Sequence, residues 1–184
     1  FAAFRVRSIL GKCGSDSTPS RTLLYRSFVR STLLYGSEIW ALGQEERIER
    51  NQVAFLKSLY FLPKSTPDYV IRQEFNVEKL IVSVVGRAVN WFLKVIAMDD
   101  SRYPKVLLMN QLRIGDTGNS ESIVYNWAGQ LKSFFVKSNN LELWSGLCGG
   151  NHTQVDSDRL LRDLSDLYKG RDLDRISSST FCPL

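Results

Sequence analysis

Apolar residues recur along most of the chain at intervals of three and four, which is the spacing of one face of an α-helix. The longest such segment runs from Glu78 to Met98 and is apolar on most sides, as expected for a helix at the centre of a core. No segment of the sequence alternates apolar and polar residues convincingly like a β-strand, and none repeats internally. The pattern therefore predicts an all-α fold, an irregular helical bundle.

Breaks in the periodicity divide the chain into a series of predicted helices. Thr18 before Pro19 and Thr66 before Pro67 are predicted N-caps, because a hydroxyl followed by proline often starts a helix. Residues 139–151 are expected to be irregular. The predicted helices span 1–10, 19–35, 44–61, 78–98, 101–113, 121–138 and 156–169, and a further one opens at Pro67.

The stretch GDTGNS at residues 115–120 is the clearest break, because glycine and small polar residues favour loops. We therefore expect a helical bundle over residues 1–113, a linker over 114–120 and a helical extension over 121–184.

The positive charge lies near the beginning of the sequence. The net charge is +5, and residues 1–35 carry six basic residues against one acidic residue, whereas 36–184 are balanced. This asymmetry favours contact with a polyanion, although a solvated basic helix face gives the same pattern. A helical wheel places Arg26 and Arg30 together on the polar side. The basic candidates are Arg5, Arg7, Lys12, Arg21, Arg26 and Arg30.

Met98-Asp99-Asp100 has the form, an apolar residue before two aspartates, with which many polymerases hold two metal ions. Here the pair follows a long predicted helix, and Asp100 or Ser101 can cap the next one. The context therefore favours a helix junction. His152 is the sole histidine, and no nucleophile elbow is present. The sequence predicts no catalytic residues, no metal site and no cofactor.

Three scattered cysteines, Cys13, Cys148 and Cys182, are too few for a disulfide framework, which favours a reducing intracellular setting, nucleus or cytoplasm. No apolar run reaches the length that spans a bilayer, so no membrane contact is expected. The chain begins at Phe1 and is expected to be a fragment of a longer protein.

Residues 33–40 read LLYGSEIW, follow SRTLLYRSFVRST and precede EERIERNQVAFLKSLYFLPKSTPDYVIRQEFNVEKL. This stretch resembles the segment just after the catalytic palm in reverse transcriptases of non-LTR retrotransposons. In that family a tyrosine–glycine pair, a small or acidic residue and an aromatic lead into Q…F…L…LP…TP. The resemblance covers about residues 1–113 and is vague from 121 onward.

The resemblance implies a thumb-like bundle and connector that pack against primer–template duplex and lean on the palm domain of the same polyprotein. The six basic candidates would lie near the nucleic-acid backbone, and Tyr35, Trp40 and Phe55 are expected in the core. Palm, endonuclease and RNase H motifs are absent from this sequence, so the chain is not expected to be an enzyme by itself. Cys182-Pro183-Leu184 would open a Cys-x-x-Cys metal knuckle only in a longer chain.

The expected function is weak, salt-sensitive contact with an RNA–DNA or other duplex inside a larger RNA-directed DNA polymerase. Two alternatives remain: a helical protein–protein interaction module, and a decayed retroelement fragment without function. The double change Arg26→Glu plus Arg30→Glu is expected to abolish duplex binding and to leave the fold intact.

Overall fold

The computed structural model describes residues 6, 8–9, 17–116, 126–149 and 156–179, and every regular element within them is helical. The all-α prediction is therefore confirmed. In chain order the elements are α2 (Thr18–Leu24), the π-helix η1 (Tyr25–Arg30), α3 (Ser31–Leu33), α4 (Ser37–Trp40), α5 (Glu45–Leu59), α6 (Asp68–Glu74), α7 (Leu80–Ile96), α8 (Tyr103–Asp116), α10 (Trp127–Lys137), α11 (Leu141–Cys148) and α12 (Ser157–Ser177).

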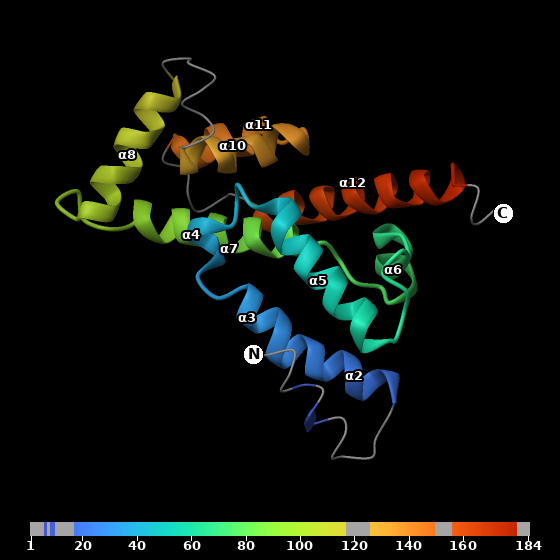
Figure 1. Ribbon diagram of the computed structural model, residues 1–184. Helices are drawn as coiled ribbons and strands as arrows, with labels where there is room; N and C mark the ends of the chain where they lie inside the picture. Colours follow the sequence, from blue (N-terminus) through green and yellow to red (C-terminus); the bar gives the residue numbers. More distant parts are fainter. Residues whose placement is uncertain (1–5, 7, 10–16, 117–125, 150–155, 180–184) are drawn as a thin grey trace.

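Helix α7 is the centre of the molecule, as its apolar sequence predicts. It packs against α4, α5, α8, α10 and α12, and its side chains Ile81, Val84, Val85 and Phe92 are fully buried. Figure 1 shows α10 and α11 on one side of α7 and the helices α2 and α3 on the other. Because a helix apolar on most sides must be covered all round, the other helices enclose α7.

The residues before and after the predicted 114–120 linker contribute to one main core. Leu131 and Phe135 of α10, Trp144 of α11 and Leu160 of α12 lie in the same apolar cluster as α7. A second, smaller cluster joins η1, α5 and α6 and includes Tyr25, Phe55 and Ile71. Phe55 is therefore a core residue, as predicted.

A buried polar network ties the start of the chain to its last helix. Arg72 of α6 donates through Nη1 to Glu49 Oε1 at 3.0 Å, and its guanidinium also pairs with Asp172 of α12. Glu49 Oε2 accepts the backbone N–H of Leu80 at 3.1 Å, and Gln52 accepts a hydrogen bond from the Tyr25 hydroxyl. The buried polar groups thus satisfy one another, as such groups must inside a core.

Several predicted helix ends are wrong. Ser17, rather than Thr18, caps α2, since its hydroxyl accepts the N–H of Ser20, and Pro67 rather than Thr66 holds the N-cap position of α6. The stretch 139–151 was expected to be irregular, yet α11 forms within it because Trp144 and Leu147 are buried. Helix α12 was predicted to end at residue 169, but it continues through Gly170 to Ser177. Asp172, in this added part of the helix, forms an ion pair with Arg72.

No helix in the described part of the chain is long and apolar enough to cross a membrane.

Candidate nucleic-acid interface

The aspartate pair lies in the turn between α7 and α8, as the sequence predicts. The Asp100 side chain is 96% exposed, and Lys105 Nζ lies 2.8 Å from its Oδ1 and donates to the Met98 carbonyl at 2.8 Å. Lys105 holds the pKa of Asp100 below its ordinary value. Among the described residues, no group of three or more histidine, cysteine, aspartate or glutamate side chains is placed to hold a metal ion.

Three of the six basic candidates, Arg21, Arg26 and Arg30, lie within the described residues, and each has different surroundings. Arg5, Arg7 and Lys12 lie outside the described residues. Arg21 donates through Nη1 to the Leu59 carbonyl at 2.7 Å, and its guanidinium carbon lies 5.7 Å from the Tyr60 ring centroid.

Arg26 and Arg30 also differ from their predicted positions. Arg30 is half-buried and donates to Ser83 Oγ of α7 at 2.6 Å, whereas Arg26 is exposed. The two side chains therefore do not share one solvent face, and Arg30 holds η1 against α7. The Arg30→Glu change would remove this part-buried contact, so it is expected to disturb the packing of η1 on α7, contrary to the expectation from the sequence.

The backbone conformation explains why these side chains depart from the positions expected for an α-helix. Residues Tyr25–Arg30 form a π-helix, which has wider turns than an α-helix, so side chains beyond it are rotated relative to an α-helical wheel. Tyr25 and Val29 remain buried, but Phe28 is 41% exposed and Tyr35 is 84% exposed. Tyr35 had been predicted in the core, so that assignment is wrong.

The motif LLYGSEIW forms a tight corner. Gly36 has φ of +62°, the left-handed conformation that glycine adopts without steric cost, and α4 starts directly after it. The corner is fixed from outside: Arg87 Nη1 donates to the Leu34 carbonyl at 3.1 Å, and Trp127 Nε1 donates to the Glu38 carbonyl at 2.8 Å. This docking of the backbone against α7 and α10 leaves Tyr35 in solvent.

Trp40, at the end of the motif, is also exposed rather than in the core. It is 48% exposed, and its Nε1 donates to the Tyr35 carbonyl at 3.3 Å, so the two aromatic residues are neighbours. The prediction of a core role for Trp40 is therefore wrong. Phe28 of η1, Tyr35 and Trp40 are thus three exposed aromatic side chains in and around this corner.

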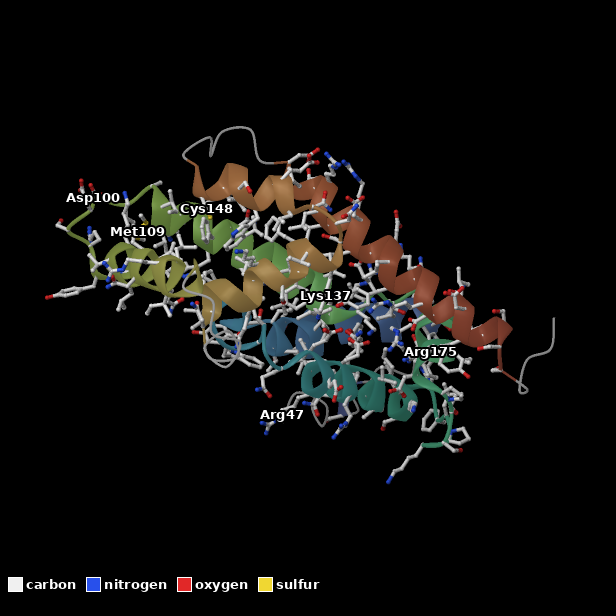
Figure 2. All side chains as sticks on the ribbon, turned by 90° about the horizontal axis from the view of Figure 1, so that it is seen from above. Arg47, Asp100, Met109, Lys137, Cys148 and Arg175 are labelled. Atoms are coloured by element: carbon white, nitrogen blue, oxygen red, sulfur yellow. The ribbon has the colours of Figure 1, made fainter. Side chains whose placement is uncertain are left out.

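An open groove of about 940 Å³ lies beside Trp40, between the start of α5 and the side of α10. Its polar lining includes Gln44, Gln130 and three cations, Arg47, Arg50 and Lys137. Arg47 and Arg50 are exposed and one helical turn apart on the outer face of α5. Figure 2 shows Arg47 at the outer edge of the molecule.

Two acidic residues, Glu45 and Glu46, also line the groove. Glu45 lies 3.6 Å from Lys79 Nζ and 3.6 Å from Lys137 Nζ, so its charge is shared between two lysines. With three cations and two carboxylates, the lining of the groove has a net charge of one positive unit. Arg47 and Arg50, on the α5 side of the groove, are both exposed to solvent.

Sequence reasoning missed this groove because charge was compared over long segments, and residues 36–184 are neutral in total. A local signal was present in the sequence, because two arginines lie one turn apart on the polar face of α5. The exposed residues of that face are Arg47, Arg50, Asn51 and Ala54. Lys137 comes from a helix far along the chain and could be placed there only by the fold.

Comparisons with protein families, with curated proteins and with solved structures found no match to this chain.

Proposed function

We propose that the chain is a non-catalytic helical module that contacts nucleic acid, corresponding to the thumb and connector region of a non-LTR retrotransposon reverse transcriptase. The observation that carries the proposal is the groove whose lining combines the cations Arg47, Arg50 and Lys137 with the half-exposed ring of Trp40. Cations along a groove combined with exposed aromatic rings are the usual means of binding nucleic acid without reading its sequence.

The resemblance of LLYGSEIW and LPKSTP supports the same proposal. The corner at Gly36 brings Tyr35 and Trp40 out of the core and sets Trp40 at the edge of the groove. Trp40, the last residue of LLYGSEIW, thus lies beside the residues that carry the positive charge. The palm domain of the same polyprotein would be the covalent partner of this module.

The binding residues proposed from the structure differ from those proposed from the sequence. Arg47, Arg50 and Lys137 take the central role, and Arg26 remains a further exposed contact. Arg21 and Arg30 are assigned to internal contacts with Leu59 and Ser83, where they hold the first helix in place.

The test is binding of a fluorescent RNA–DNA duplex to the purified chain at low salt, followed by anisotropy. The double variant Arg47→Glu plus Arg50→Glu is expected to weaken binding by about tenfold or more, because two phosphate contacts become repulsive. The matched control is Lys169→Glu plus Arg175→Glu on α12, which makes the same charge change at exposed sites away from the groove. Equal losses in the two variants, or no binding by the folded parent chain, would contradict the proposal.

The alternative function, a helical protein–protein interaction module, also has an observation in its favour. Helix α8 carries exposed apolar side chains, among them Tyr103 and Leu107. Contiguous apolar surface of this kind marks interaction sites.

A further inference from the structure

Helix α8 has apolar side chains on two opposite faces, and only one of them is covered. On the inner face Leu108 is 5% exposed, and Leu112 packs against the main core. The outer face consists of two adjacent rows at helical spacing, Tyr103, Leu107 and Asn110 in one and Val106, Met109 and Arg113 in the other. All six residues are exposed. A helix embedded on one side only is expected to be polar on the other, so this outer face is unusual.

The position of α8 makes this face accessible. The helix extends from the end of α7 at one side of the molecule (Figure 1). Tyr103 is 83% exposed, Leu107 is 61% exposed and Met109 is 52% exposed. Tyr103 and Leu107 also border an apolar cleft of about 340 Å³, whose far wall includes Ile39, itself exposed.

We propose that the outer face of α8 is a homodimer interface, in which it pairs antiparallel with α8 of a second copy about a two-fold axis. The charges favour a second copy over a partner of a single sign. The start of α8 carries both signs of charge, the exposed Asp99, Asp100 and Arg102 together with Lys105, which is bound to Asp100, and the exposed Arg113 lies near the end of the helix. An antiparallel pair brings Asp100 of each copy beside Arg113 of the other.

One register of the two α8 helices gives apolar, hydrogen-bonding and charged side chains suitable partners at the same time. Val106 meets the partner's Leu107 next to the axis, so the apolar centre is closed. Tyr103 then faces the partner's Asn110, whose amide can bond the phenolic hydroxyl, and Asp100 faces the partner's Arg113. Each contact occurs twice, as a two-fold interface requires, and the antiparallel helix dipoles attract.

The available area is in the range of a weak dimer. The exposed parts of Ile39, Tyr103, Val106, Leu107 and Met109 amount to roughly 500 Å² of apolar surface per copy, taking about 150–200 Å² for each full side chain. A polar rim from Asn110 and Arg113 brings the contact toward the ~800 Å² per partner of a standard interface. A dissociation constant in the micromolar range is therefore expected.

The test is the mass of the purified chain in solution, measured by sedimentation at increasing concentration. The parent is expected to change from the 21.0 kDa monomer to a species of twice that mass. A single change in the middle of the interface, Leu107→Asp, is expected to weaken association by about tenfold or more. Leu173→Asp on α12 is the matched control, because Leu173 is also half-exposed, and it should leave association unchanged.

The register is tested by exchanging charges. Asp100→Arg and Arg113→Asp should each weaken the dimer, and the two changes combined should restore it, because the opposite charges again face each other. Asp100→Arg and the double variant both lack the internal contact between Asp100 and Lys105, so only a contact between copies explains why the double variant dimerises better than Asp100→Arg alone.

If Leu107→Asp lowers the helical content, the variant no longer tests the interface, and a cross-link between two copies tests it instead. Val106→Cys, in a chain whose Cys13, Cys148 and Cys182 are replaced by serine, is expected to form an intermolecular disulfide under mild oxidation. Three outcomes would overturn the proposal: a monomer up to about 100 μM, where a micromolar dimer is populated; a dimer unaffected by a folded Leu107→Asp variant; and no cross-link at position 106. Duplex binding plays no part in these measurements, so they stand apart from the proposed function.

Discussion

Arg72 and Asp172 are one hundred residues apart in the chain and form a two-bonded ion pair inside the protein. Arg72 Nε donates to Asp172 Oδ2 at 2.6 Å, and Nη2 donates to Oδ1 at 2.8 Å. The guanidinium is 6% exposed and also binds Glu49, so α5, α6 and α12 meet at one side chain. The planar arginine fork matches the carboxylate, which fixes the position of the last helix relative to the first half of the chain.

Replacing Asp172 by asparagine is expected to destabilise the fold strongly. Arg72 would keep Glu49 but lose its two-bonded partner, and an incompletely paired buried charge is costly. We expect the free energy of unfolding to fall by about 3 kcal/mol, near the lower end for breaking a buried pair. Urea denaturation followed by circular dichroism measures the effect, with the exposed Asp174→Asn as control; a loss as small as the control's would contradict a structural role for the pair.

The stability of the fold is expected to fall in alkali, because Tyr25 is buried. Burial raises the pKa of its phenol above the ordinary value of 10.0, although Arg30 opposes the shift. The folded protein therefore keeps a proton that the unfolded chain loses above pH 10. The contribution of Tyr25 to the free energy of unfolding is full below pH 10 and declines as the pH rises. The expected decline is about 1.4 kcal/mol per pH unit for one proton.

Denaturant titrations between neutral pH and pH 11 measure this decline in the parent and in Tyr25→Phe. The variant is expected to start less stable by about 1 kcal/mol, since it loses the hydrogen bond to Gln52. Its decline in alkali should nevertheless be shallower, and the buried Tyr168, whose pKa is raised in the same way, should account for part of the remainder. An identical slope in the two proteins would remove Tyr25 as the cause.

Gly36→Ala is expected to destabilise the corner that carries the exposed aromatic residues. The backbone there has φ of +62°, and an L-residue in this conformation costs about 1–2 kcal/mol. Gly146→Ala is the control, because no atom lies near its added Cβ and alanine favours a helix interior. Thermal unfolding should therefore show a lower midpoint for the first variant and an unchanged or higher midpoint for the second.

The helices that sequence periodicity predicted well are those whose apolar pattern is long and local. Helix α7 was placed within two residues at each end, since Leu80 to Ile96 is apolar over many turns. Helix α11 was missed because it has only eight residues, and the glycines around it suggested a turn. Its stability depends on Trp144 packing against Phe92 and Phe135, contacts that exist only in the folded protein.

The candidate interface was harder to predict than the fold. Arg30 has the same sequence signal as Arg26, and only the distance to Ser83 shows that it is used inside the protein. The exposure of Tyr35 depends on the π-helix before it and on the left-handed Gly36 after it, and a wheel drawn for a uniform α-helix contains neither.

Duplex binding is expected to depend on salt through the groove cations. If Arg47, Arg50 and Lys137 each neutralise one phosphate, the logarithm of the affinity falls with the logarithm of salt concentration at a slope of about −2.7. Replacing Lys137 by methionine keeps much of its length and removes one charge, so the slope should become shallower by about 0.9. Anisotropy titrations from low to physiological salt give both slopes. An unchanged slope would mean that Lys137 contacts no phosphate.

Trp40 is expected to contribute mainly where unpaired bases are available, because a paired base in a duplex offers no free face. Trp40→Ala should weaken binding to a duplex with a single-stranded overhang by about 1–3 kcal/mol, the usual value for stacking on one base. Binding to a blunt duplex should change much less, and Trp40→Phe should retain most of the affinity for both. Parallel anisotropy titrations with the two substrates separate this role from a packing role. An equal loss on the overhang and the blunt duplex would mean that Trp40 supports the shape of the corner at Gly36, to whose neighbour Tyr35 it is hydrogen-bonded, instead of stacking on a base.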